Sequence, residues 1–305
     1  MTPSRDRTAM PNATATPLAD AERRVDGSPA QARSATAPGA GSTASTTARH
    51  RASRRGRAVA AVWPIVASLV VFVVAWQLVV FVSGFPPYIL PGPLSVGQRF
   101  VRAWLDGTMW PHVSTTLVEV LLGFALGASV ALVAGIALAR SRLAERLLSP
   151  YLVAAQATPV LALAPLIALW FGTDLPSKLV ICTLIVFFPV AVATMVGIRS
   201  VDPRLLEMAR SFRAGSWQTI TRVEVPAALP AILGGMRVGV TLSVIGAIVG
   251  EWAGADKGLG VLINIARGSL FDIPLMFAAL LQLAIIGVAL YLVMLLIERR
   301  LVGER

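Results

Sequence analysis

Six polar side chains stand inside long apolar stretches of this chain, and they are its most informative candidates for chemistry. Amide, hydroxyl and carboxylate groups are costly in a lipid environment, so such residues indicate a path for a polar solute. The six are Gln77, Glu119, Gln156, Thr158, Glu251 and Gln282. The adjacent Trp76, Pro159 and Trp252 complete the set that we predict to line a translocation pathway.

Each of these residues also has a purely structural interpretation. Thr158 could hydrogen-bond the backbone of its own helix beside Pro159, where a proline removes a backbone donor. Glu251 could sit at the outer interface, and Glu119 could lie a turn from water or pair with a neighbouring arginine. The sequence leaves both interpretations open.

Hydrolytic and metal chemistry find no support in the residue pattern. Cys182 is the one cysteine, and His50 and His112, the two histidines, lie far apart without ligand spacing. An intramembrane enzyme would need a nucleophile with a base, or converging ligands, within the spans. We therefore predict no catalytic residue and no metal site. The chain also lacks the Gly-x4-Gly-Lys-Ser/Thr loop that holds ATP phosphates.

The elements that must position these residues are membrane-spanning helices. The 305 residues are 56% hydrophobic and 14% charged, which is typical of an all-α polytopic membrane protein. A span needs about 20 mostly apolar residues. This predicts about six transmembrane helices, near residues 59–82, 113–139, 152–171, 178–198, 229–251 and 276–297.

The net charge is +11, and the basic residues lie mostly in the tail and beside the apolar runs. This distribution indicates the orientation of the chain in the membrane and does not indicate a nucleic-acid site. With the N-terminus inside, eleven arginines besides those of the tail at 1–57 fall in inner segments, and five basic residues fall in outer ones. The inner group is Arg140, Arg142, Arg146, Arg199, Arg204, Arg210, Arg213, Arg222, Arg299, Arg300 and Arg305. The outer group is Arg99, Arg102, Lys178, Lys257 and Arg267. This predicts a multi-pass protein of the plasma membrane with both termini in the cytoplasm.

Residues 1–57 are rich in Ala, Thr, Ser, Pro and Arg, which predicts a disordered, basic cytoplasmic tail. Residues 58–305 form the predicted membrane domain. Arg54-Arg55 resembles a twin-arginine export signal, but the apolar run after it is long enough to span and shows no clear cleavage site. A positive flank of the first span is the favoured interpretation.

Between the first two spans, a short amphipathic helix is predicted from Leu94, with Phe100, Val101, Trp104 and Leu105 on one side. Small residues recur at every fourth position in the second and fifth spans. They are Gly123, Gly127, Ala131 and Gly135, then Gly235/Gly239 and Gly246/Gly250. Such spacing allows close approach of helix backbones, either inside one bundle or between two chains.

Residues 199–228 form a polar loop between the fourth and fifth spans, predicted to be cytoplasmic. Asp202-Pro203 predicts a helix start, Gly215 a break, and Trp217 lies on a second short helix that ends before Pro226. This pattern fits a helix on lipid headgroups and a helix that docks in a groove of a soluble partner equally well.

The loop resembles the "EAA" loop of permease subunits of ATP-binding-cassette importers. Glu207-Met208-Ala209 stands for Glu-Ala-Ala, and Pro226 follows Glu207 at the family's spacing. Arg213 stands where the family has glycine, and a glycine occurs instead at Gly215. The segments "LPGPLSV", "HVSTTLVEVLLGFALG", "ATPVLALAPLIALWFG", "VDPRLLEMARSF" and "GADKGLGVLI" resemble the nitrate/sulfonate/taurine-type branch over residues 85–300.

The resemblance implies the type I importer permease fold and a set of partners. In the family two permease chains pair, two ATPase subunits bind their cytoplasmic loops, and an extracytoplasmic binding protein delivers solute. A homodimer is the expected pairing. ATP and Mg would be bound by the ATPase, with no cofactor in this chain. The implied ATPase-coupling residues are Glu207, Met208, Ala209, Phe212, Arg213, Gly215, Trp217 and Pro226.

The solute is the least determined feature. No arginine cluster lies in mid-span, and Glu119 and Glu251 suit a neutral or cationic solute. "TLVEVLLGF" and "GEWAGADKGLG" resemble permeases for thiamine-pyrimidine precursors or riboflavin, and nitrate, sulfonate or taurine is the alternative. An ion-coupled carrier, the alternative from another class, would favour internal repeats that the chain does not show.

Overall fold

The computed structural model describes residues 44–303, which are helical throughout apart from turns and short connections. The chain divides into two units, Met1–Trp63 and Pro64–Arg305. The boundary falls inside helix α1, Ala44–Ser83, so the helix begins within the segment predicted to be a disordered tail. Residues 1–43 of that tail lie outside the described residues.

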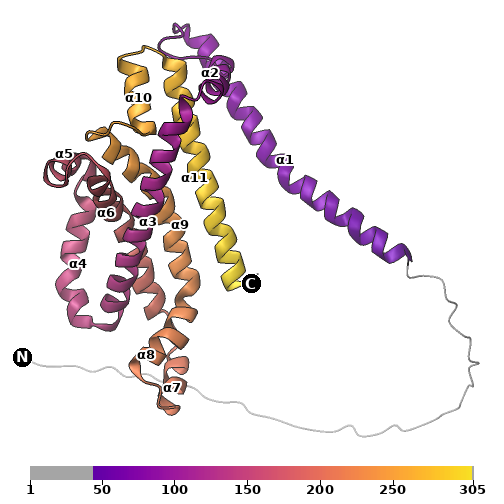
Figure 1. The fold of residues 1–305 in the computed structure, drawn as a ribbon. Coiled ribbons are helices and arrows are strands. Elements are labelled where there is room, and N and C mark those ends of the chain that lie inside the picture. The colour runs from indigo at the N-terminus through magenta and orange to yellow at the C-terminus, as the bar shows by residue number, and fades with distance from the viewer. Residues whose placement is uncertain (1–43, 304–305) are drawn as a thin grey trace, which may run out of the picture. The chain divides into compact units, whose positions relative to one another are not determined.

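The second unit is a helical bundle (Figure 1). After α1 its elements are α2 (Pro93–Leu105), α3 (Met109–Arg140), α4 (Arg142–Ala157), α5 (Val160–Phe171), α6 (Leu175–Arg199), α7 (Pro203–Ser211), α8 (Ser216–Thr219), the π-helical turn η1 (Ile220–Glu224), α9 (Val225–Trp252), α10 (Leu259–Gly268) and α11 (Ile273–Val302). Helices α3, α6 and α9 form its centre. Figure 1 places α7 and α8 at one end of the bundle and α2 and α10 at the other.

Five helical stretches among the described residues are long and apolar enough to cross a membrane. They are Trp63–Ser83, Met109–Arg140, Leu175–Arg199, Ser216–Trp252 and Ile273–Val302. These correspond to five of the six predicted spans. Large apolar side chains on their outer faces, such as Phe72 and Val133, are exposed, as expected of surfaces that face lipid.

The prediction of one continuous span at 152–171 was wrong. Helix α4 ends at Ala157, and α5 begins at Val160. Pro159 causes the break, because a proline disfavours helical geometry at the preceding residue and cannot donate a backbone hydrogen bond. Pro159 itself is extended, with φ −71° and ψ 101°. In Figure 1, α5 lies at the end of α4 away from α7.

The small residues of α3 and α9 allow these helices to pack closely on α6. A Cβ added at Gly123 would lie 2.3 Å from the Cβ of Cys182, and one at Gly246 would lie 2.9 Å from the Cα of Cys182. No real Cβ makes contacts this short, so only glycine fits at either position. Of the two uses predicted for these residues, the structure shows the one inside a single chain.

Helix α2 follows the predicted amphipathic segment but buries only part of the predicted face. Ala103 and Val96 are buried, and Phe100 and Trp104 are half-buried against the core. Val101 and Leu105, on the same predicted side, are exposed. Helix α2 contacts the bundle mainly through α11. The stripe of α2 that α11 covers is narrower than the apolar side predicted from the sequence.

Candidate functional site

One constant register between α3 and α6 brings two buried charges together. Gly123 faces Cys182, Gly127 faces Val186, and one step along the same register Glu119 faces Lys178. The Lys178 Nζ lies 2.8 Å from Glu119 Oε1, and both side chains are buried. Isolated charges cannot be buried without a large desolvation cost, so this pair depends on the close helix packing beneath it.

Glu251, at the end of α9, folds the α9–α10 connection around its carboxylate. Thr116 donates its hydroxyl to Oε1 and the Gly260 backbone N–H donates to Oε2, each at 2.5 Å. Gly258 has φ +137°, and a Cβ there would lie 2.1 Å from the Glu251 carboxyl carbon. Gly258 is therefore required for this close approach, as is Gly260, where a Cβ would lie 2.8 Å from Glu251 Oε2.

A second set of contacts fastens the same connection to α3. The backbone N–H of Leu259 donates to Thr116 Oγ1 at 2.8 Å, and His112 Nδ1 lies within 3.1 Å of both backbone polar atoms of Gly258. Glu251, Thr116 and His112 thus anchor the end of the connection at Gly258, Leu259 and Gly260.

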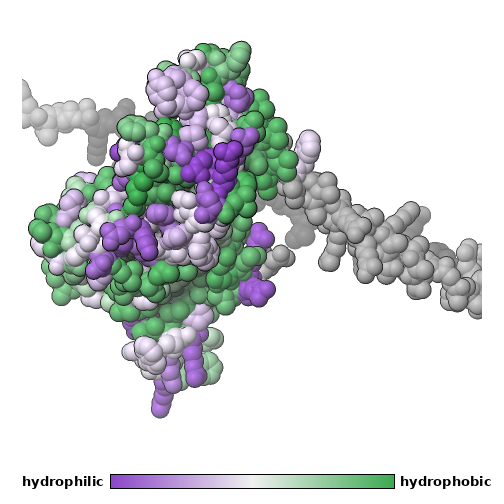
Figure 2. All heavy atoms as spheres, turned by 45° about the horizontal axis from the view of Figure 1, so that its top comes forward, coloured by the Kyte–Doolittle hydropathy of each residue, from purple (hydrophilic) through white to green (hydrophobic). Residues whose placement is uncertain are grey.

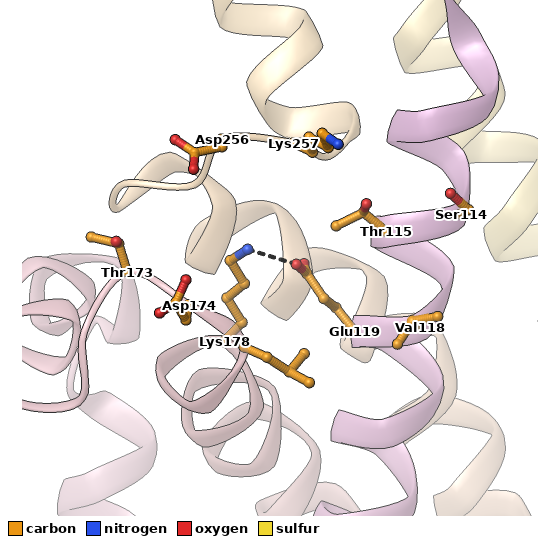
Figure 3. A pocket seen from close by; sticks show the side chains of 10 residues that line it. Ser114, Thr115, Val118, Glu119, Thr173, Asp174, Lys178, Asp256 and Lys257 are labelled. Atoms are coloured by element: carbon orange, nitrogen blue, oxygen red, sulfur yellow. Dashed lines mark ion pairs between the residues drawn. The ribbon is translucent and has the colours of Figure 1, made fainter.

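A polar cavity opens beside the Glu119–Lys178 pair (Figure 3). Its volume is about 450 Å³, and it lies between α3, the α5–α6 connection and the α9–α10 connection. Its polar lining consists of hydroxyls and charges of both signs, namely Ser114, Thr115, Glu119, Thr173, Asp174, Lys178, Asp256 and Lys257. Figure 2, which turns the α2–α10 end forward, shows hydrophilic side chains gathered between hydrophobic surfaces.

The other predicted pathway residues are dispersed. Trp76 stacks on Phe277 at 5.9 Å between ring centroids, and Gln282 accepts a hydrogen bond from Trp104 at 3.3 Å. Trp252 donates to the Gly260 carbonyl at 3.1 Å, which adds to the support of the α9–α10 connection.

The predicted residues around the α4–α5 break do not join the cavity either. Thr158 donates to the Ala154 carbonyl, which is the structural interpretation that the sequence left open. Pro159 is exposed. The side chain of Gln156 lies outside what the structure describes. Of the predicted residues whose side chains the structure describes, only Glu119 lines the polar cavity, with Glu251 beside it.

At the opposite end of the bundle, α7 and α8 carry exposed apolar side chains. Phe212 is 80% exposed, Trp217 is 75% exposed and Met208 is 50% exposed. Ala209 is buried beneath them, and Glu207 is exposed on the same helix. Figure 1 shows this pair of short helices extending beyond the ends of the neighbouring long helices.

The turn between α7 and α8 is centred on Arg213 and not on Gly215. Arg213 has φ +53°, in the left-handed region that favours glycine. Its N–H bonds to the Arg210 carbonyl, and the Ala214 N–H bonds to the Ala209 carbonyl, which together make the Schellman motif that ends a helix. Gly215 is extended and begins α8. The turn therefore falls where the importer family has its glycine.

The second helix of the loop does not end before Pro226, contrary to the sequence prediction. It continues from Ser216 through η1 into α9, so Pro226 lies in the first turn of α9. The wider π-helical turn places Glu224 toward α3, where it forms an ion pair with Arg140 at 3.2 Å. The α7–α8 end is thus joined to two central helices, α9 and α3.

Sequence reasoning missed Lys178, Thr116 and His112. Lys178 was counted only as an outer positive charge, and the two others lie in a helix whose apolar pattern dominated the interpretation. The register of Gly123 with Cys182 is the signal that predicts the Glu119–Lys178 pair, but the pairing of α3 with α6 must be known first. Among the described residues, no group of three His, Cys, Asp or Glu side chains could hold a metal ion.

Comparison with known proteins identifies the class that this bundle represents. Residues 127–303 match the family of the binding-protein-dependent transport system inner membrane component. The chain belongs to this family and is a permease subunit of an ATP-binding-cassette importer.

Among its relatives is the riboflavin transport system permease protein of Chloroflexus aurantiacus, which is 46% identical over 79% of this chain and 90% of its own length. The formylaminopyrimidine transport permease protein of Halalkalibacterium halodurans is 35% identical over 70% of this chain and 85% of its own. The putative aliphatic sulfonates transport permease protein of Bacillus subtilis is 34% identical over 77% and 85%.

A solved structure of the MetNI methionine ABC transporter in an inward-facing conformation has a similar fold, with a TM-score of 0.54 at 22% identity. The match covers 65% of this chain and 96% of that one. It confirms the predicted type I importer permease fold.

Proposed function

We propose that α7 and α8 dock in the cleft of a separate ATP-binding-cassette ATPase on the cytoplasmic side of the membrane. The observation that carries this proposal is the exposure of Phe212 and Trp217, on either side of a hydrogen-bonded turn at the end of the bundle. Exposed aromatic side chains this close together are typical of a protein–protein contact. Glu207, Met208, Ala209 and Arg213 complete the docking surface, with Gly215 and Pro226 shaping its second helix.

Docking of α7 and α8 would couple ATP hydrolysis by the ATPase to movements of the translocation pathway. The coupling would run through the continuous helix that joins α8 to α9. Because helix runs without a break from Ser216 to Trp252, a displacement of α8 is transmitted to α9. The Arg140–Glu224 ion pair transmits it to α3 as well. In this scheme the ATPase binds ATP and Mg, and closure of two ATPases on ATP switches two permease chains between outward- and inward-facing states.

The remaining partners follow from the same arrangement. A second copy of this chain completes the pathway, and a solute-binding protein docks at the α2–α10 end, outside the cell. Glu119 and Glu251 keep the pathway role predicted from the sequence. The segment at 1–57 is then a basic cytoplasmic tail, and the loop at 199–228 is the cytoplasmic coupling loop. Both termini are then in the cytoplasm of a plasma-membrane protein.

We propose a neutral heterocyclic solute, riboflavin or a thiamine-pyrimidine precursor. Identities of 46% and 35% to permeases named for riboflavin and formylaminopyrimidine support this class. The cavity beside Glu119 carries carboxylates among its ammonium groups, which disfavours a fixed anion site. A sulfonate is the alternative, because a sulfonate permease is 34% identical.

Capture of the ATPase from detergent extracts tests the docking surface. With an affinity tag on the full chain co-expressed with the ATPase of its transport system, we expect Phe212→Glu to reduce the captured ATPase at least tenfold, since it places a charge in an apolar contact. Phe271→Glu is the matched control, because Phe271 is 79% exposed and lies between α10 and α11, at the opposite end.

Equal capture by both variants and the wild type would mean that α7 and α8 do not bind an ATPase. A helix that only lies on lipid headgroups predicts that result. Uptake that persists without any ATPase would exclude the ATP-driven mechanism.

A further inference from the structure

A second polar cavity, which we call the arginine cavity, lies where α3 ends, α4 begins and α6 ends. Its volume is about 520 Å³, and its lining residues are Ala139, Arg142, Glu145, Arg146 and Arg199. Three guanidinium groups against one carboxylate give this lining a net charge of +2. The arginine cavity shares no lining residue with the polar cavity of Figure 3.

Arg199 forms the fixed wall of the arginine cavity. Its Nε and Nη2 donate to the backbone carbonyls of Ala139 and Leu138, at 3.3 and 2.9 Å, and its Nη1 donates to the Glu145 carboxylate. These contacts join the end of α6 to the end of α3 and to the first turn of α4. A guanidinium group has five N–H donors, so these three contacts leave Arg199 able to donate to a ligand as well.

Arg142 and Arg146 lie one turn apart on α4, and both are exposed. Neither forms an ion pair within 4 Å of an acidic residue that the structure describes. The hydrogen bond from Arg199, followed by the charges of Arg146 and Arg142, lowers the pKa of Glu145. Glu145 is therefore ionised at neutral pH, but its one charge balances only one of the three arginines.

Guanidinium groups around a cavity of this size favour a phosphate group as ligand. The planar fork of arginine matches two phosphate oxygens, and hydrogen bonds between ions are roughly twice as strong as neutral ones. The N-terminus of α4 adds to the positive potential, because Ser141 is extended and the helix begins at Arg142. The volume is in the range of roughly 300–1,000 Å³ that is typical of ligand pockets.

An apolar stripe beside the arginines favours a lipid as the source of the phosphate. Leu143, Leu147 and Tyr151 follow one another at every fourth position of α4, and all three are exposed. Consecutive residues of a helix lie about 100° apart, so this stripe runs next to the one formed by Arg142 and Arg146. Arginines next to exposed apolar side chains at the end of a membrane span are typical of contact with anionic lipid.

We infer that the arginine cavity binds the phosphate group of an anionic lipid of the inner leaflet, with Arg142, Arg146 and Arg199 as its donors. The acyl chains then lie along Leu143 and Leu147. A lipid bound in this way joins α4 to the ends of α3 and α6. The inference uses the proposed orientation, in which the α7–α8 end faces the cytoplasm, and it does not depend on docking of an ATPase.

Binding of short-chain lipids to the purified full chain in detergent tests the inference. Dioctanoyl phosphatidylglycerol and dioctanoyl phosphatidylcholine have the same acyl chains, but only the first has a net negative charge. Native mass spectrometry measures how much of each lipid binds. We expect the wild type to bind phosphatidylglycerol at least about tenfold more tightly, the scale of one hydrogen bond to a charged group. Arg142→Gln/Arg146→Gln should reduce this preference to less than about threefold.

Two matched controls separate recognition from overall charge and from folding. Arg299→Gln/Arg300→Gln removes two exposed arginines from the last turn of α11, also predicted to be cytoplasmic, and should keep the preference. Glu145→Gln removes the carboxylate that competes with the phosphate, so it should tighten phosphatidylglycerol binding several-fold although it deletes a stabilising ion pair. Glu207→Gln makes the same change of charge outside the cavity and should not tighten binding.

Equal loss of preference in the two double-arginine variants would overturn the inference, because lipid would then respond only to total charge. An undiminished preference in Arg142→Gln/Arg146→Gln would also overturn it.

A third pair of measurements distinguishes lipid from soluble phosphate. Leu143→Gln/Leu147→Gln should weaken phosphatidylglycerol binding at least about threefold, and millimolar inorganic phosphate should not displace the lipid from the wild type. Displacement by inorganic phosphate together with no effect of the leucine changes would assign the cavity to a soluble phosphate and overturn the assignment to lipid. ATPase capture distinguishes these failures from failure of the proposed function, since none of the cavity variants alters α7 or α8.

Discussion

At the scale of single residues, Arg213 adopts a left-handed backbone conformation that is usually found at glycine. Its left-handed φ of +53° lets the Ala214 N–H reach the Ala209 carbonyl and end α7. The left-handed conformation costs a non-glycine residue about 1–2 kcal/mol. That cost is compatible with the fold because two backbone hydrogen bonds and the buried Ala209 hold the turn.

Replacing Arg213 with glycine should therefore make the turn more stable. Relief of about 1–2 kcal/mol of strain exceeds the roughly 0.4–1 kcal/mol that glycine adds to the freedom of the unfolded chain. Amide hydrogen exchange of residues 213–215 in the purified chain should become several-fold slower. Arg210→Gly, inside α7, is the contrasting control and should accelerate exchange, because glycine within a helix costs about 1 kcal/mol. Faster exchange in Arg213→Gly would show that its side chain, not its backbone, stabilises the turn.

At the scale of elements, the contact of α3 with α6 determines where the buried charges meet. Gly123 and Gly135 each face an α6 residue at a distance that excludes a Cβ, and a Cβ added at Gly127 would lie only 3.0 Å from the Cβ of Val186. Glu119 and Lys178 continue the same register. The close packing of the small residues of α3 on α6 thus brings Glu119 and Lys178, which are distant in the sequence, into one ion pair.

Gly123→Ala should separate α3 from α6 and lower the thermal midpoint of the purified chain markedly. The added methyl group would overlap the Cβ of Cys182, and forced overpacking of a core costs about 1–3 kcal/mol. Gly287→Ala in α11 is the matched control, because nothing lies within 4 Å of a Cβ added there. This control should leave the midpoint unchanged or raise it, as alanine favours helix by up to about 1 kcal/mol. Identical midpoints for both variants would refute the close packing.

A second element contact predicts a pH dependence. Arg199 of α6 donates to the Leu138 carbonyl at the end of α3 and to the Glu145 carboxylate of α4. The hydrogen bond from Arg199 lowers the pKa of Glu145 below its ordinary value of 4.5. Because the pKa is lower in the folded chain, this contribution to stability is present above about pH 4.5 and is lost as the pH falls through the folded-state value.

The thermal midpoint of Glu145→Gln should accordingly lie below that of the wild type at pH 7, and the two should converge in acid. Salt should reduce the difference at pH 7, since the pair is at the surface. Glu207→Gln changes an exposed glutamate that forms no ion pair with any residue that the structure describes, and it should follow the wild type throughout. A difference for Glu145→Gln that persists unchanged at pH 3 would rule out the ion pair as its source.

At the scale of the whole molecule, the second unit has two chemically different ends. The α2–α10 end carries the mixed-charge cavity, and the α7–α8 end carries exposed aromatic residues among arginines. The arginines at the α7–α8 end belong to the excess of positive charge that predicts the cytoplasmic side of the membrane.

Labelling of single introduced cysteines in intact cells tests this orientation. Lys257→Cys should react with a membrane-impermeant maleimide from outside, whereas Arg210→Cys should react only after the cells are made permeable. Both positions are exposed, and the native Cys182 is fully buried, so unmodified chain serves as the unlabelled control. The reverse pattern would place α7 and α8 outside and would remove the basis for ATPase docking.

The sequence by itself determined the class of protein and five of the membrane-crossing helices. Those features are local: about 20 consecutive apolar residues are enough to span lipid, and the loop spacing from Glu207 to Pro226 can be read along the chain. The break at Pro159 is also a local feature of the sequence, because a proline disfavours helix at the residue before it. The prediction of one continuous span at 152–171 gave more weight to the apolar character of these residues.

Only the tertiary structure decided which polar residues meet. Glu119 and Lys178 pair because α3 and α6 lie side by side in one register, and Glu251 folds a glycine-rich connection onto Thr116. The position of the turn likewise depends on the hydrogen bonds that end α7. These bonds place the left-handed conformation at Arg213, although glycine, which is found at Gly215, adopts that conformation more easily. Contacts between distant segments are not encoded in the composition of either one, because they arise from the packing of helix against helix.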